Sequence, residues 1–226
     1  MKESWAVASA ESPQVARQVV TMPSKLCQSM LRRADELHNR GLKAFGVLTG
    51  HPSDHATPYS AVDAVFFDAS NNRRNDPHYR SAFRAQGNYF REYEDAGFVA
   101  DPRELLQVWR TVERAGQEVI APFHIHRRQP ANFSMIDYRL HNPAFAWHLI
   151  VSLSEPGRPV LQPFSVKKSD SEFGINADDD LEHSEQSYDG PEVRPMTLVV
   201  RGGESSIRQL IGTLSPPPES KLLLGA

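Results

Sequence analysis

Residues 119–137 read VIAPFHIHRRQPANFSMID, and this stretch decides the fold that the rest of the chain completes. Its first five residues are apolar and follow closely on Gly116, so they predict a buried central strand. The strand leads directly into His124, Ile125 and His126. Alternate residues of an extended segment point to the same side, so the two histidines can face one site while Ile125 packs into the core.

A serine and an aspartate follow the histidines at a spacing that suits a short helix. Ser134 can cap a helix over 135–140, and Asp137 then lies in its first turn, on the same face as the serine. Catalytic Zn²⁺ takes three protein ligands and leaves a fourth position for water. The pattern therefore predicts that His124, His126 and Asp137 bind zinc, while the Ser134 hydroxyl points toward a substrate carbonyl. Ordinary core or surface histidines are the competing interpretation of H-x-H, and the number and type of ligands disfavour it.

Apolar patterns on both sides of this stretch predict the remaining elements. Ser24 can cap an amphipathic helix that Gly41 ends, and Asp101 can cap another that runs to about Gly116, with Glu104 reaching back to the cap amide. A further helix is expected over 78–96, and strands are expected over 44–50, 62–67, 119–123, 147–153 and 160–166. The sequence thus predicts an α/β or α+β domain with a sheet of about five strands.

The two ends of the chain are expected to lie outside that domain. Residues 1–22 have few periodic apolar positions and predict a flexible N-terminal arm, which leaves a domain over 23–166. Residues 167–226 are expected to form an acidic loop and a C-terminal extension, with an edge strand over 196–200. The loop, residues 168–192, holds nine acidic residues against one lysine, so we expect a solvated excursion; a metal site or an electrostatic docking surface are the alternatives.

Composition excludes several classes of protein. The chain has 226 residues, of which 39% are hydrophobic and 23% charged, as in ordinary globular proteins. A net charge of −3 gives no positive field for a nucleic acid. Cys27 is the single cysteine and cannot form an internal disulfide, and the N-terminus lacks the apolar run of a signal peptide, so the sequence predicts a cytoplasmic protein. No apolar run reaches the roughly 20 residues that a membrane span needs.

The pattern H-x-H-x7-S-x2-D resembles the signature of the JAMM/MPN+ zinc metallopeptidases, and residues 45–50, FGVLTG, are similar to the family's C-G-x-L-x-G strand. The resemblance covers about residues 24–166, with the helix, the strand and the zinc segment in the family's order. It implies a cytidine-deaminase-like fold, in which a mixed sheet lies between helices. It also implies a zinc-dependent peptidase or isopeptidase that uses a metal-activated water. The expected substrate is the C-terminal tail of a ubiquitin-like sulfur-carrier protein, as in bacterial members of the family. The sequence does not decide between a monomer and a homo-oligomer.

One position departs from the family's pattern. The family has a glutamate three residues before the first glycine of the strand, where it accepts a proton from the zinc-bound water, and this chain has Lys43 there. Base assistance typically contributes ~10²- to 10⁴-fold to a rate. The base can be recruited from elsewhere, with candidates Glu36, Glu92, Glu94 and Glu118. Alternatively, Lys43 orients an anionic substrate group, or the chain is a catalytically silent MPN-type module that binds a ubiquitin-like partner.

Several other polar residues lie near the zinc segment. His141 and His148 are expected to be hydrogen-bonded structural histidines, although His141 lies one turn past Asp137 and can serve as its partner outside the ligand set. Arg127 and Arg128 follow the zinc histidines directly, where they can attract a tail that carries a carboxylate or simply stay solvated.

Overall fold

The computed structural model describes residues 18–52, 59–70, 76–77, 80–81, 100–155, 157–169 and 187–202. Within them a six-stranded sheet runs in the order β3-β2-β4-β5-β6-β7, and a separate two-stranded sheet pairs β1 with β8. β4 and β5 are parallel, and the other neighbours in the large sheet are antiparallel. The architecture is therefore mixed α+β, as expected, with more strands than the five predicted. The elements are β1 (Val19–Pro23), α1 (Ser24–Asn39), β2 (Phe45–Gly50), β3 (Asp63–Phe66), α4 (Pro102–Arg114), β4 (Glu118–His126), α5 (Met135–Leu140), β5 (Trp147–Ser152), β6 (Val160–Val166), β7 (Val193–Pro195) and β8 (Thr197–Arg201).

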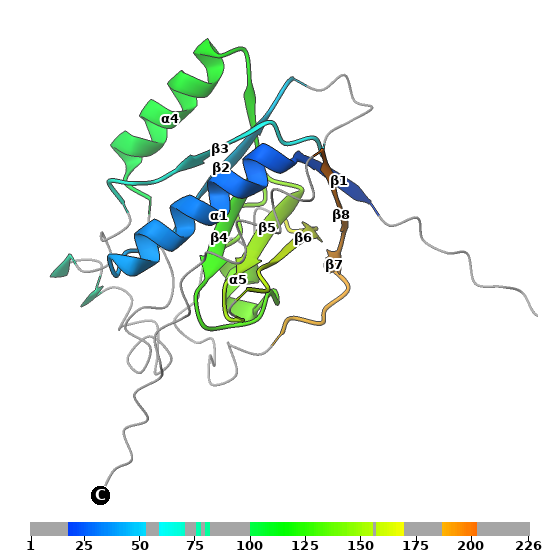
Figure 1. Cartoon of the computed structure of the whole chain (residues 1–226). Helices are drawn as coiled ribbons and strands as arrows, with labels where there is room; N and C mark the ends of the chain where they lie inside the picture. The colour runs from blue at the N-terminus through cyan, green and yellow to red at the C-terminus, as the bar shows by residue number, and fades with distance from the viewer. Residues whose placement is uncertain are drawn as a thin grey trace, which may run out of the picture.

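Helix α1 lies across one face of the large sheet (Figure 1). Its apolar stripe packs in one cluster with inward-facing residues of β4 and β5, among them Phe123, Ile125 and Leu149. Gly41 adopts a left-handed φ of 71° just after the helix, as the sequence predicts. The predicted cap is wrong by one residue, because Pro23 is the N-cap and Ser24 is already helical.

Helices α4 and α5 pack on the opposite face of the sheet. Phe45 of β2 and Ile150 of β5 are both register partners of His124, so all three side chains point to the same face. Phe45 belongs to the cluster that receives Val108 of α4, and Ile150 to the cluster that receives Tyr138 of α5. The face that carries His124 is therefore the face that α5 covers.

Asp101 caps α4 as predicted, by accepting hydrogen bonds from the backbone nitrogens of Arg103 and Glu104. The Glu104 prediction is wrong: its carboxylate accepts bonds from the Ala69 nitrogen, at 2.8 Å, and from the Ser70 hydroxyl instead of the cap amide. The Asp101 nitrogen donates to the Ser70 hydroxyl oxygen at 2.7 Å. Glu104 thus ties the start of α4 to the turn after β3, which no local pattern reveals.

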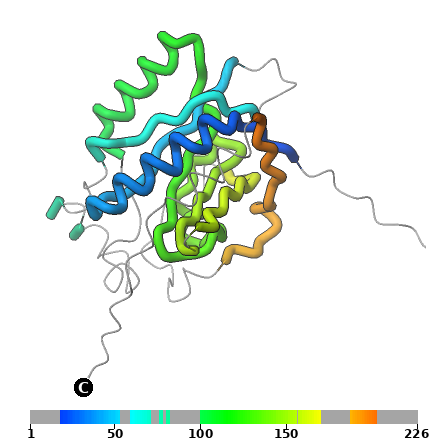
Figure 2. Tube along the Cα trace, in the orientation of Figure 1, coloured from blue at the N-terminus to red at the C-terminus, as the bar shows by residue number. Residues whose placement is uncertain are grey.

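The N-terminal residues are held more firmly than predicted. Residues 19–23 form β1, which pairs in parallel with β8, and Val20 and Met22 are fully buried. The predicted arm therefore does not extend to residue 22; residues 1–17 lie outside the described part of the chain. Figure 2 shows β1 beside the returning chain of β7 and β8, which makes residues 193–201 part of the fold and not an extension from it.

Two further predictions fall mainly on residues outside the described ranges. Of the helix expected over 78–96, the structure describes only residues 80 and 81, which are helical. Of the acidic loop, it describes 168–169 and 187–192. Among the residues it does describe, no helix has both the length and the apolar character needed to cross a membrane.

Candidate metal centre

The end of β4 brings the two predicted histidines to one side of the sheet. The strand extends through residue 126, so His124 and His126 both lie on it, and Ile125 between them packs into the opposite core, as predicted. The Nε2 atoms of the two histidines lie 2.8 Å apart. His124 is 5% exposed, whereas His126 is partly exposed, so the pair lies at the edge of the buried region.

Helix α5 brings Asp137 to the same place. Ser134 is its N-cap, and the pair forms a capping box: the Ser134 nitrogen donates to Asp137 Oδ2 at 2.9 Å, and the Asp137 nitrogen donates to the Ser134 hydroxyl oxygen at 3.2 Å. This box leaves Oδ1 of Asp137 3.2 Å from Nε2 of His124. One donor atom from each of His124, His126 and Asp137 lies within 4.8 Å of the other two, so the three predicted ligands are brought together.

The Ser134 hydroxyl has a different partner from the one the sequence suggests. It donates to Asp137 Oδ2 at 2.7 Å. A hydroxyl has a single proton, so in this arrangement it holds the carboxylate and does not point at a substrate. Ser134 therefore orients Asp137 here, and its contact with a substrate carbonyl stays a prediction.

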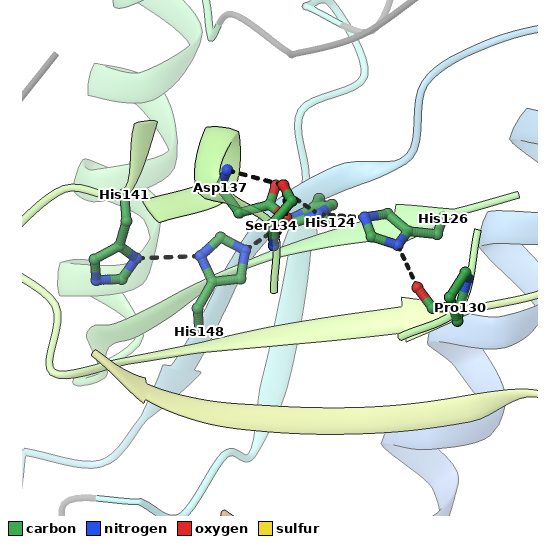
Figure 3. A network of polar contacts seen from close by, with 7 residues as sticks. All are labelled: His124, His126, Pro130, Ser134, Asp137, His141 and His148. Atoms are coloured by element: carbon green, nitrogen blue, oxygen red, sulfur yellow. Dashed lines mark hydrogen bonds and ion pairs between the residues drawn. The ribbon is translucent and has the colours of Figure 1, made fainter. Parts of the chain in front are cut away.

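Two more histidines extend the site into the core (Figure 3). His124 Nδ1 lies 2.8 Å from His148 Nε2, and His148 Nδ1 lies 3.2 Å from His141 Nδ1. His141 Nε2 then reaches the Phe145 carbonyl at 2.8 Å. At the other end, His126 Nδ1 lies 2.7 Å from the Pro130 carbonyl. The four imidazoles thus form one row that ends on a backbone carbonyl at each side.

The two carbonyls decide where protons sit in this row. A carbonyl only accepts, so His126 carries a proton on Nδ1 and His141 carries one on Nε2. In neutral rings this leaves His126 Nε2 and His141 Nδ1 bare. His124 and His148 then supply one proton each for the three nitrogen–nitrogen contacts of the row. Two protons cannot occupy three nitrogen–nitrogen contacts. When all four rings are neutral, one contact therefore has neither a proton nor another cation between its two nitrogens.

Burial opposes a second proton on three of the four rings, those of His124, His148 and His141. Desolvation is the largest cause that lowers the pKa of His124 and of His148 well below the ordinary value, and it lowers the pKa of His141 to about 4. The contact between His124 and His126 is the one with a carboxylate beside it, Asp137. It is the place where a divalent cation would satisfy the row.

The residue at the position of the family's glutamate lies close to this centre. Lys43 is half-buried, and its positive charge contributes to the lowered pKa of His124. Lys43 and Arg127 both contribute to lowering the pKa of His38 as well, after desolvation. Positive charge therefore gathers at this end of β4, where the family's pattern has a carboxylate.

The candidate replacement bases are placed unevenly. Glu118 is the first residue of β4, whereas His124 and His126 are near its end, about 20 Å away at the usual rise of a strand. Glu36 is half exposed and pairs with Arg33 at 3.2 Å. Glu92 and Glu94 lie outside the described residues. Glu118 therefore lies at the far end of its strand, and Glu36 lies on α1, which packs on the sheet face opposite to His124.

Sequence reasoning did not assign His148 to the site. The sequence predicts hydrogen-bonded structural histidines at both His141 and His148, with His141 as a further candidate partner for Asp137 because it lies one turn on. The signal that identifies His148 is strand pairing: Ile150 of β5 is opposite His124, so His148, two residues earlier, lies on the same face.

No protein-family model matches the chain, and no curated protein matches its sequence. Among solved structures, the chain is similar to the solution structure of protein DSY2949 from Desulfitobacterium hafniense. The two are 21% identical, with a TM-score of 0.50, over 83% of this chain and 97% of that one. At this level of identity the likeness concerns the fold alone.

Proposed function

We propose that this chain is a zinc-dependent hydrolase of the JAMM type that cleaves a peptide or isopeptide bond at the C-terminal tail of a ubiquitin-like sulfur-carrier protein. One observation carries the metal part of the proposal. Two imidazole nitrogens 2.8 Å apart and a carboxylate oxygen 3.2 Å from one of them converge at a partly buried place, where the neutral row of histidines leaves one contact without a proton or another cation.

The donor set favours zinc among the divalent ions. Two imidazole nitrogens and one carboxylate oxygen suit Zn²⁺, whereas Mg²⁺ and Ca²⁺ prefer oxygen alone. Bonds of about 2.0–2.1 Å place two zinc-bound nitrogens roughly 3.3 Å apart, so the two rings need to separate by only about half an ångström. When bound, zinc lowers the pKa of a water molecule and polarises a carbonyl.

Ser134 supports the chemistry in two steps. It first holds Asp137 Oδ2 with both its nitrogen and its hydroxyl, which directs Oδ1 to the ligand position. If the hydroxyl turns to donate to a developing oxyanion, the backbone nitrogen still holds the carboxylate. Asp137 therefore stays oriented while the serine changes partner.

The substrate class comes from the sequence resemblance, and the local charge agrees with it. Lys43 and Arg127 place positive charge at the end of β4, beside the proposed zinc ligands. Where a single residue lies beyond the scissile bond, it carries the C-terminal carboxylate of the substrate, which this charge attracts.

Zinc content and tail cleavage together test the proposal. Metal analysis of the pure protein is expected to give one zinc per chain, and mass spectrometry is expected to show a shortened tail when a ubiquitin-like carrier with a C-terminal extension is the substrate. His126→Ala should lose both properties. His51→Ala, a change to an exposed histidine outside the site, should keep both. If the wild type holds no zinc, the proposal fails.

Lys43 favours a second function. A cation stands where the family has its base, so a module that holds a ubiquitin-like partner without cleaving it also agrees with the site. This alternative predicts that zinc raises the melting temperature and that the carrier binds, while its tail stays intact under every condition. Zinc-loaded wild type that binds the carrier without shortening it would establish the module and refute the hydrolase.

A further inference from the structure

We propose that His148 and His141 are positioning residues that fix the tautomer of His124, so that Nε2 of this ligand is always bare toward the metal. The inference rests on the proposed metal centre and adds two residues that the signature does not contain. Its starting point is the row of contacts from His124 through His148 and His141 to the Phe145 carbonyl.

The direction of the row follows from its buried end. The Phe145 carbonyl requires a proton on His141 Nε2, which leaves Nδ1 of that ring as an acceptor. His148 then donates from Nδ1, and its Nε2 accepts from Nδ1 of His124. The proton of His124 is thereby kept on the nitrogen that faces the core, and its Nε2 carries a lone pair.

A cation between His124 and His126 completes this arrangement. With that contact filled, each of the two remaining nitrogen–nitrogen contacts holds one proton, and every ring nitrogen of the row has a partner. The reverse direction would bring two bare nitrogens together at His148 and His141, where no carboxylate takes part in the contact. A metal ion at the His124–His126 contact therefore selects the tautomers that give each of the other two contacts one proton.

Packing keeps the rings in place. His148 and His141 are 3% and 2% exposed, so bulk water does not replace their contacts. The Phe133 ring meets His148 edge to face, at 5.5 Å between centroids and 85° between planes, and it also lies against His141. Phe164 of β6 is the register partner of His148. These contacts oppose rotation of the two imidazoles.

We expect the contact between His148 and His124 to raise the affinity of the site for zinc. A ligand histidine whose second nitrogen donates to a fixed acceptor is oriented and more basic, and loss of such an acceptor typically costs about 10- to 100-fold in metal affinity. Without His148, the proton of His124 can move to Nε2, and zinc must then displace it.

Nuclear magnetic resonance of the zinc-loaded wild type tests the tautomers directly. Long-range proton–nitrogen correlation spectra distinguish protonated from bare ring nitrogens. We expect the proton of His148 on Nδ1 and that of His141 on Nε2. A proton on Nε2 of His148 would overturn the inference and leave the metal centre intact.

A pair of substitutions at one position tests the effect on affinity. Gln can both accept from His124 and donate to His141, whereas Leu can do neither. In competition with a zinc chelator, we expect His148→Leu to bind zinc about 10- to 100-fold more weakly than wild type, and His148→Gln to recover most of that loss. His38→Leu is the matched control, because it changes another buried histidine that makes no contact in the row.

The outcomes separate the inference from the proposed function. Wild type without zinc refutes the metal centre. Wild type with zinc, together with a His148→Leu variant of unchanged zinc affinity, refutes the positioning role alone. Unfolding of the metal-free variants is measured in parallel. Equal zinc losses in the Gln and Leu variants would make His148 a packing residue, and that result also overturns the inference.

Discussion

Oδ2 of Asp137 accepts two hydrogen bonds from Ser134, at 2.9 Å from its backbone nitrogen and at 2.7 Å from its hydroxyl. The same pair begins α5, because the Ser134 hydroxyl oxygen accepts from the Asp137 nitrogen. One pair of residues therefore begins the helix and aims the carboxylate at His124. Under the proposed function, the stability of the helix and the affinity for zinc are linked through this pair.

Ser134→Ala tests that link. Loss of the cap should lower the free energy of unfolding of the metal-free protein by about 1 kcal/mol, and the less restrained carboxylate should weaken zinc binding by about tenfold. Urea unfolding and chelator competition measure the two effects. Ser134→Thr keeps a hydroxyl and should show less of both. Unchanged zinc affinity in the Ala variant would mean that the backbone nitrogen alone orients Asp137.

Lys43→Glu tests the role of the residue that departs from the family's pattern. A carboxylate at this position would replace a cation with a base, and we expect the rate of tail cleavage to rise by about 10²-fold. Lys25→Glu makes the same change of charge at an exposed residue of α1 and should leave the rate unchanged. A slower rate in Lys43→Glu would show that the lysine itself takes part, through an anionic group of the substrate.

Lys168→Met tests what holds the other end of α5. The Lys168 Nζ donates to the carbonyls of Tyr138, Arg139 and His141, at 2.5, 2.6 and 3.2 Å, at the C-terminal end of the helix. Loss of this cation should cost about 1–2 kcal/mol of the free energy of unfolding. Thermal unfolding measures the change, and Lys167→Met, at an exposed neighbour, is the control. Equal melting temperatures for the two variants would contradict a capping role.

Acid should weaken the metal-free protein through His38. Burial, followed by the charges of Arg127 and Lys43, lowers the pKa of His38 from 6.5 to about 4, and its Nδ1 has no hydrogen-bond partner among the described residues. The unfolded chain takes up this proton first as the pH falls, so the free energy of unfolding should decrease between about pH 6.5 and 4. Urea unfolding across this range should give a shallower slope for His38→Leu. The exposed His51→Leu should follow wild type. Parallel slopes for His38→Leu and wild type would refute the assignment.

The parts of the fold that the sequence predicts are those determined by residues close together in the chain. Strands expected over 44–50, 147–153 and 160–166 match β2, β5 and β6 to within a residue, because the apolar residues of these short stretches indicate buried strands. Strand β1 was missed because it is short and is stabilised by β8, which lies far along the chain. The partner of Glu104 was missed for the same reason.

The same distinction between local and long-range contacts applies to the candidate metal centre. His124, His126 and Asp137 come from one stretch in which a strand end and a helix cap fix their placement, so the sequence predicted their convergence. The contact of His148 with His124 depends on the parallel pairing of β4 with β5, which no spacing in the sequence encodes.

The pairing of β1 with β8 has a consequence for how the protein can be handled. Residues 19–23 pair with 197–201 and contain two fully buried side chains, Val20 and Met22. A fragment that begins at Ser24 would lack both of these side chains. It would also leave the backbone of β8 without its partner. An open strand edge beside newly exposed apolar surface is a template for aggregation. Such a shortened chain should precipitate, although it still contains every residue of the candidate metal centre.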